Sequence, residues 1–271
     1  MFFVNLNLRS VYKDPGLLEA FLAKGLNPEL GLDPVLMDMT DLNWHVRMAE
    51  RLGREGLSCS LHLPFFDLQP GSADALVLEA TRRRLSLAME VARIYAPSHL
   101  VGHARYDHLL YMHSHQSWLA RAGATWRAAL AGWPNHPPLY LENTFEPDPR
   151  SVATVAGELC RQEDGPVGLC LDLGHWYSFA GGKDKDNLDS WLEAFGGKLG
   201  LLHLHDNDGS FDHHLGLGQG RIPWAEVFAG LAKRDLRPRV TFEPHGEEAL
   251  SATLAFVAEH RDWFAPLGVT V

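Results

Sequence analysis

The chain has 271 residues, with 24 Lys and Arg against 34 Asp and Glu, which gives a net charge of −10. Hydrophobic residues make up 46% of the chain and charged residues 21%, proportions that are typical of a packed globular protein. The composition therefore excludes intrinsic disorder and a fibrous structure. The excess of acidic residues makes nucleic acid an unfavourable partner, because a polyphosphate is repelled unless basic residues cluster locally.

No uncharged apolar run approaches the ~18 residues that would indicate a membrane span. The first residues, Met1-Phe2-Phe3, lack the basic leader and apolar region of a signal peptide. The cysteines are too few and too scattered for a disulfide framework. We therefore expect a cytoplasmic protein that makes no contact with a membrane.

Short apolar runs alternate with longer amphipathic segments along the whole chain. The runs cover residues 2–8, 29–33, 58–63, 99–103, 139–142, 168–173, 199–204 and 239–242. They are bounded by Gly or Pro and are nearly continuously apolar, a pattern that predicts parallel strands buried on both faces.

Helical periodicity marks the segments between these runs. Apolar residues recur at helical spacing over 17–22 and 85–92, and further helices are predicted over 40–55, 110–132, 148–162, 186–196, 223–233 and 247–263. Eight strands alternating with eight helices predict an α/β fold, a single (β/α)8 TIM barrel over residues 1–271. A doubly wound sheet is the alternative, but the first run is not followed by the Gly-x-Gly-x-x-Gly motif of such folds.

Imidazole and carboxylate groups lie at the C-terminal ends of six successive predicted strands, where barrels of this kind carry their chemistry. These residues are His62, His103, Glu142, Asp172 with His175 just beyond it, His203 and Glu243. Several carboxylates in one cavity repel one another unless a cation compensates. A mixture of imidazole and carboxylate favours zinc, manganese, iron or cobalt over calcium or magnesium. Any one of these residues alone is more often a loop anchor or a hydrogen-bonded core group, so the predicted metal site depends on all six strands together.

The segment after the seventh predicted strand, residues 203–224, is rich in His, Asp and Gly. Asp212 and His214 point the same way if the chain is locally extended, and they would then complete a second or third metal position. The alternative is a solvated loop that happens to contain these residues.

These motifs, taken together and in order, resemble the xylose isomerase-like TIM-barrel superfamily, which includes endonuclease IV and sugar epimerases. The resemblance covers His62 to Glu243 and includes Leu-Glu-Asn, Asp-x-x-His, the His-x-x-Asp frame from His203 to Asp206, and a final Glu-Pro. It implies one of two ligand sets. The sugar isomerase branch would bind one metal through residues matching Glu142, Asp172, His203 and Glu243. Endonuclease IV would bind three zinc ions through nine residues, which match His62, His103, Glu142, Asp172, His175, His203, Asp212, His214 and Glu243. His205 remains the alternative to His203, because the strand register could slip.

Three functions are compatible with these residues. The complete ligand set favours a hydrolase with two or three zinc ions that acts on a small phosphoester, or on an amide or ester, with Glu142 bridging the metals and accepting a proton. The alternative is an isomerase or epimerase of a sugar or sugar phosphate, with a single manganese or cobalt ion and with Glu142 and Glu243 as the acid/base pair. The third is a barrel that binds a metal or ligand without catalysis.

Four residues near the strand ends are candidates for contact with a small-molecule substrate. Arg9 and Arg105 would hold a phosphate or carboxylate, although exposed ion pairs explain them equally well. Phe66 and Trp176 would stack on a sugar, although aromatic side chains near strand ends are as often plain packing. A homodimer is also compatible with this fold, since barrels of this kind often pair.

Overall fold

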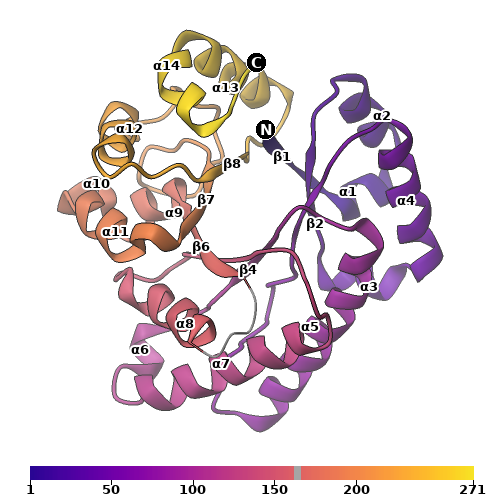
Figure 1. Ribbon diagram of the computed structural model, residues 1–271, viewed down its shortest axis with the longest axis vertical. Coiled ribbons are helices and arrows are strands. Elements are labelled where there is room, and N and C mark those ends of the chain that lie inside the picture. Colours follow the sequence, from indigo (N-terminus) through magenta and orange to yellow (C-terminus); the bar gives the residue numbers. More distant parts are fainter. Residues whose placement is uncertain (162–165) are drawn as a thin grey trace.

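Eight parallel strands close into a barrel in the order of the chain, and β1 pairs with β8 to complete the ring (Figure 1). The computed structural model describes residues 1–161 and 166–271. The strands are β1 (Phe2–Asn7), β2 (Pro28–Gly31), β3 (Ser60–His62), β4 (Leu100–His103), β5 (Leu139–Glu142), β6 (Val167–Asp172), β7 (Leu199–Leu204) and β8 (Arg239–Phe242). The predicted (β/α)8 TIM barrel is confirmed, and pairing of the first strand with the last excludes the doubly wound sheet.

Helices follow the strands and surround the ring (Figure 1). They are α1 (Leu8–Lys13), α2 (Gly16–Ala23), α3 (Pro34–Met39), α4 (Leu42–Arg54), α5 (Ala75–Tyr95), α6 (His108–Tyr111), α7 (His115–Ala131), α8 (Arg150–Cys160), α9 (Leu173–Ser178), α10 (Gly182–Lys185), α11 (Leu188–Phe195), α12 (Trp224–Lys233), α13 (Glu247–Glu259) and α14 (Arg261–Phe264), with 3-10 turns η1 (Gly196–Lys198) and η2 (Ala265–Leu267). Among the described residues, none of the helices is both long and apolar enough to cross a bilayer.

Two predicted helices are divided in the structure. The segment 110–132 contains the end of α6 and the whole of α7, and the segment 247–263 breaks at His260 between α13 and α14. The helix expected over 148–162 forms as α8, but residue 162 lies outside the described residues. Aspartates set several helix starts: Asp41 accepts from the N–H of Trp44 at 2.8 Å, and Asp74 accepts from that of Leu76 at 2.8 Å. Such caps satisfy N–H groups that have no partner within the helix.

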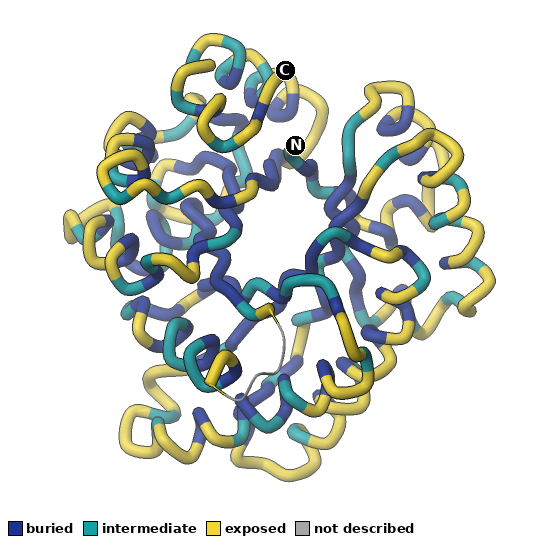
Figure 2. The backbone as a smooth tube through the Cα atoms, in the orientation of Figure 1, coloured by how far each residue is buried: buried dark blue, intermediate teal, exposed yellow. Residues whose placement is uncertain are grey.

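The barrel has two separate apolar regions. The larger one lies between strands and helices, and Figure 2 shows the buried strand ring inside helices whose outer faces are exposed. The smaller one consists of Val101, Cys170 and Leu201, with Tyr140 packed against it. Each of these three residues lies two positions before His103, Asp172 or His203, so each shares a strand face with a predicted ligand. The predicted ligands therefore lie one layer further along the strands, toward the C-terminal mouth.

Candidate metal centre

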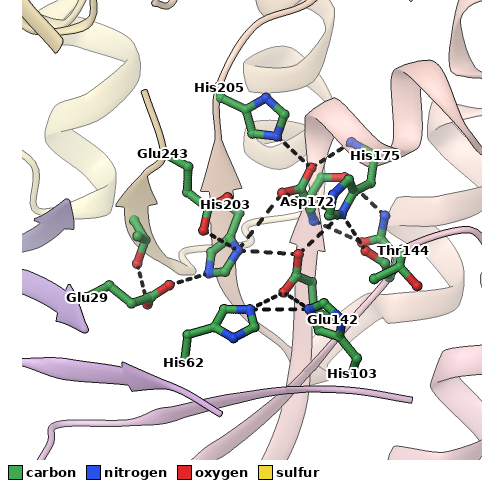
Figure 3. A network of polar contacts seen from close by, with 12 residues as sticks. Glu29, His62, His103, Glu142, Thr144, Asp172, His175, His203, His205 and Glu243 are labelled. Atoms are coloured by element: carbon green, nitrogen blue, oxygen red, sulfur yellow. Dashed lines mark hydrogen bonds and ion pairs between the residues drawn. The ribbon is translucent and has the colours of Figure 1, made fainter. Parts of the chain in front are cut away.

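All nine predicted metal ligands meet at the C-terminal mouth of the barrel, and Figure 3 shows most of them converging on Glu142 and Asp172. They come from β3, β4, β5, β6, β7, the residue after β8, the start of α9, and the loop between β7 and α12. Their ligand atoms form three neighbouring clusters. The first two share Glu142, and His175 lies between Glu142 and the third.

The first cluster consists of His62, His103 and Glu142. Oε2 of Glu142 lies 3.0 Å from Nε2 of His62 and 3.0 Å from Nε2 of His103, and the two nitrogens are 3.2 Å apart. Ligands ~2.1 Å from a tetrahedral zinc ion would be spaced at about 3.4 Å, close to these separations. His62 donates its Nδ1–H to the carbonyl of Leu63 at 2.9 Å, which leaves Nε2 as the ligand atom.

The second cluster surrounds Nδ1 of His203. This nitrogen lies 3.2 Å from Oε1 of Glu243, 3.5 Å from Oε1 of Glu142 and 4.0 Å from Oδ2 of Asp172. Nδ1 of His203 and Oδ2 of Asp172 are both buried, and neither has a hydrogen-bond partner in the described part of the chain. Three carboxylate oxygens and one imidazole nitrogen therefore converge with two of their atoms unsatisfied, which fits a divalent cation.

The third cluster is centred on Asp212, in the loop between β7 and α12. Its Oδ2 lies 3.3 Å from Nε2 of His175 and 3.1 Å from Nε2 of His214. Both imidazoles donate from the opposite nitrogen: His175 to the carbonyl of Asn143 at 2.9 Å, and His214 to that of Glu243 at 2.7 Å. Both Nε2 atoms are thereby directed at Asp212. Asp212 and His214 therefore face the mouth of the barrel, as expected for a second or third metal position, whereas Asp208 and His213 of the same loop are exposed, as in the solvated alternative.

His203 in β7 and His205, which directly follows β7, both face the site, as expected for residues two apart in an extended chain. His203 faces the carboxylates of the second cluster. His205 is fully buried, with Nε2 3.3 Å from Oδ1 of Asp172 and 3.5 Å from Oδ1 of Asp212, and its ring stacks on His214 at 3.8 Å. A Cβ at Gly174 would lie 1.9 Å from the His205 ring, so glycine is required there. His205 thus lines the third cluster, where its ring nitrogen lies close enough to Asp212 and His214 to share a metal with them, while His203 faces the second cluster.

Burial and neighbouring charges shift the pKa values of several residues of the site. Burial raises the pKa of Glu142, but the imidazoles of His103 and His203 outweigh it, and the pKa lies well below its ordinary value. Burial raises the pKa of Glu243. Burial lowers the pKa of His103 to about 4, so this ligand is neutral near pH 7. Burial also disfavours the charged form of His214, but its hydrogen bond to Asp212 raises the pKa to about 9.

A buried carboxylate near the site, Glu29, was not singled out by sequence. Glu29 lies in β2 beneath His203, with its Oε1 3.0 Å from Nε2 of that ring. Burial raises the pKa of Glu29, but the imidazoles of His203 and His99 hold it well below its ordinary value. The signal available in the sequence was a carboxylate at the first position of a predicted apolar strand, where burial requires a partner.

Asp206, the end of the His-x-x-Asp frame, anchors the loop that carries the third cluster. Its carboxylate accepts from the N–H of Gly218 at 2.9 Å, from that of Ile222 at 3.2 Å and from the indole of Trp224 at 2.9 Å. A Cβ at Gly220 would lie 2.2 Å from Oδ1 of Asp206, so the loop can close on this carboxylate only with glycine there. Asp206 therefore positions Asp212 and does not face the clusters itself.

Three of the four candidate substrate residues present surface at the mouth. Phe66 is 62% exposed and stacks on Phe65, which stacks in turn on the ring of His103. Arg105 lies over the ring of Phe145 at 5.8 Å. The side chain of Arg9 is 39% exposed and lies 3.6 Å from a carboxylate oxygen of Asp33.

Trp176 does not fit the expected contact with substrate. Its side chain is 1% exposed, and its indole donates to the side chain of Asn187 at 2.8 Å. The ring packs beneath α10, where a Cβ on Gly182 would lie 2.5 Å from it. The aromatic residue next to His175 therefore packs in the core, because it points to the opposite side of α9.

The fold and the clusters define a (β/α)8 barrel whose mouth gathers the donor atoms that divalent metals bind. The model of the xylose isomerase-like TIM-barrel family matches residues 29–265, and the chain belongs to this family. The resemblance predicted from the motifs is thereby confirmed.

Curated relatives of this chain include a probable endonuclease and an uncharacterized protein. A probable endonuclease 4 of Mycobacterium leprae is 26% identical over 218 residues, which cover 78% of this chain and 82% of the relative. The uncharacterized protein y4fM of Sinorhizobium fredii is 35% identical over 95 residues, 35% of this chain, and the match spans only 29% of that protein's length.

Solved structures with the same fold include an epimerase-like protein and an endonuclease. A D-tagatose 3-epimerase-like protein superposes with a TM-score of 0.72 at 18% identity, over 99% of this chain and 98% of its own. Endonuclease IV from Thermus thermophilus superposes with a TM-score of 0.65 at 21% identity, over 97% and 98% of the two chains. At these identities the similarity shows the fold alone.

Proposed function

We propose that this protein is a metal-dependent hydrolase that holds two or three zinc ions and cleaves a small phosphorylated or polyhydroxylated metabolite at a phosphoester, amide or ester bond. The third cluster carries the proposal: Oδ2 of Asp212 lies within 3.3 Å of one ring nitrogen each of His175 and His214. A reaction that needs a single metal has no use for these three ligands.

Glu142 would bridge two metal positions. Its Oε2 faces His62 and His103, whereas its Oε1 lies 3.5 Å from Nδ1 of His203. Zinc, when bound, lowers the pKa of a water molecule and polarises the oxygen of the scissile group. The Glu142 carboxylate lies between the clusters, where it would accept the proton that an attacking water gives up.

Arg105 and Phe66 would select the substrate. Arg105 has a backbone φ of 58°, which is a costly conformation for a residue with a Cβ, and no carboxylate of the described residues lies within ion-pair distance of it. We propose that it holds a phosphate or carboxylate, with Arg9 as a second cation across the mouth. The exposed ring of Phe66 would cover an apolar face of the substrate. The net charge of −10 argues against nucleic acid as the substrate. We also propose that the protein is cytoplasmic.

Metal content and turnover of one double variant test this function. The wild-type protein, purified without chelator, should contain two or three zinc ions per chain by elemental analysis and should hydrolyse members of a panel of small phosphoesters. Changing Asp212 and His214 together to Ala should remove at least one ion and abolish hydrolysis. Asp208→Asn is the matched control, because Asp208 is an exposed carboxylate of the same loop that bonds Ser210.

An isomerase or epimerase of a sugar or sugar phosphate is the second candidate. One geometric observation favours it: Oε1 of Glu142 and Oε1 of Glu243 both approach Nδ1 of His203, at 3.5 and 3.2 Å. Two carboxylates on either side of one metal position would serve as base and acid for a single proton transfer. A single exchangeable manganese or cobalt ion, with turnover that survives the Asp212 and His214 double change, would replace hydrolysis with this function.

A further inference from the structure

A buried carboxylate lies on the far side of His203 from the second cluster. Glu29 is 1% exposed, and its Oε1 lies 3.0 Å from Nε2 of His203. The other ring nitrogen, Nδ1, faces the carboxylates of Glu142, Asp172 and Glu243. His203 is therefore placed between two acidic regions, one on each of its nitrogens (Figure 3).

The Glu29 carboxylate is held in place by neighbouring strands. Its Oε2 accepts from Oγ of Ser60 in β3 at 3.0 Å and from Oγ1 of Thr241 in β8 at 2.9 Å, and Nε2 of His99 lies 3.5 Å away. All of these side chains are buried. Burying a carboxylate is costly unless its oxygens are satisfied. Oε2 of Glu29 has two hydroxyl donors, whereas Oε1 makes no well-aligned hydrogen bond in the described part of the chain and faces Nε2 of His203, which also lacks one, at 3.0 Å.

We propose that Glu29 is a positioning residue for the metal centre: it accepts the Nε2–H of His203 and thereby directs Nδ1 of that ring, unprotonated, at the second metal position. A ligand histidine whose second nitrogen donates to a carboxylate has a fixed orientation and a more basic ligand atom. The proposal gives Glu29 no bond to the metal, although it lies close enough to His203 and Glu243 to share one, because its Oε1 faces Nε2 of His203 and its Oε2 accepts from two hydroxyls. This inference depends on the metal binding in the proposed function and extends it to a residue remote from the substrate.

Two substitutions separate positioning from mere packing. Glu29→Met has a similar volume and no acceptor, so His203 loses its partner and zinc affinity should fall by ~10–100-fold. Glu29→Gln keeps a carbonyl acceptor for Nε2–H, and its amide N–H groups can donate to the hydroxyls, so it should restore most of the affinity. Asp33→Asn is the matched control. This carboxylate lies just beyond β2 and accepts from the N–H of Leu36, not from a predicted metal ligand.

Zinc affinity is measured by competition with a chromophoric chelator, and the His203 Nε2–H proton is observed by NMR in the zinc-loaded protein. In the wild type this proton should be shifted downfield and exchange slowly, whereas in Glu29→Met it should exchange rapidly. If Glu29→Met fails to fold, the double change of Ser60→Ala and Thr241→Val frees Oε2 of Glu29 and should give a smaller loss of affinity.

Unchanged zinc affinity in Glu29→Met would overturn the inference, even if the metal-free protein melts at a lower temperature. If the wild type binds zinc and Glu29→Met binds it equally well, only the role of Glu29 is refuted. Wild-type protein that binds no zinc refutes the proposed function, and this inference with it.

Discussion

Replacing Asp206 with Ala should release the loop that carries the third cluster. The Asp206 carboxylate accepts four hydrogen bonds, from the N–H groups of Asn207, Gly218 and Ile222 and from the indole of Trp224, at 2.9 to 3.2 Å. Each donor left buried without a partner costs ~1–3 kcal/mol. If water reaches two of the four donors, the free energy of unfolding should fall by about 2–6 kcal/mol.

Loss of the Asp206 carboxylate should also affect one metal position more than the others. The loop positions Asp212 and His214, so Asp206→Ala should lose the third metal position, whereas His62 and His103, on β3 and β4, keep theirs. Urea unfolding of the metal-free protein measures the loss of stability, and elemental analysis measures the loss of metal. Wild-type stability together with a full metal count would refute the assignment of Asp206 as the loop anchor. The exposed Asp208→Asn is again the control.

Three further changes follow from the same geometry. In the metal-free protein, the hydrogen bond to Asp212 raises the pKa of His214 to about 9. Protonated His214 should therefore stabilise the fold by up to about 3 kcal/mol below pH 6.5, and this stabilisation should be lost as the pH rises through 9. A melting temperature that stays constant from pH 6.5 to 9.5 would contradict this. Arg105→Gln should raise KM for an anionic substrate about tenfold or more and leave kcat nearly unchanged, because one charge-assisted hydrogen bond to the substrate is lost. A KM equal to that of the wild type in steady-state assays would exclude this residue from substrate binding. Gly220→Ala should destabilise the protein because its Cβ would lie 2.2 Å from Asp206, and a wild-type urea midpoint would show that the loop can shift.

The ligand positions could be predicted because they follow from strand ends. Parallel strands of one barrel all present their C-terminal residues at the same mouth, so His62, His103, Glu142 and Asp172 had to meet once the strands were located. Asp212 and His214 were harder to place, because a loop of irregular backbone has no periodicity from which to infer direction. The Asp206 carboxylate fixes that loop, and its role was hidden because its partners are mostly backbone N–H groups.

Trp176 and Glu29 show what the sequence pattern could not predict: the direction of a side chain and contacts between distant strands. Trp176 follows the ligand His175 directly, but the turn of α9 sends its indole into the core. Glu29 stood at the edge of a predicted strand, and only the closed barrel brings β2 opposite His203 on β7. Contacts across a barrel depend on its closure and stagger, which local sequence does not encode.

The central claim is that the acids and imidazoles at the barrel mouth bind adjacent divalent cations. Anomalous diffraction from zinc-loaded crystals, recorded on both sides of the zinc absorption edge, tests it most directly. The account predicts a peak between His62, His103 and Glu142, a second bounded by Nδ1 of His203 and Glu243, and a third beside Asp212. A map without peaks at these positions, from protein loaded with excess zinc, would contradict it.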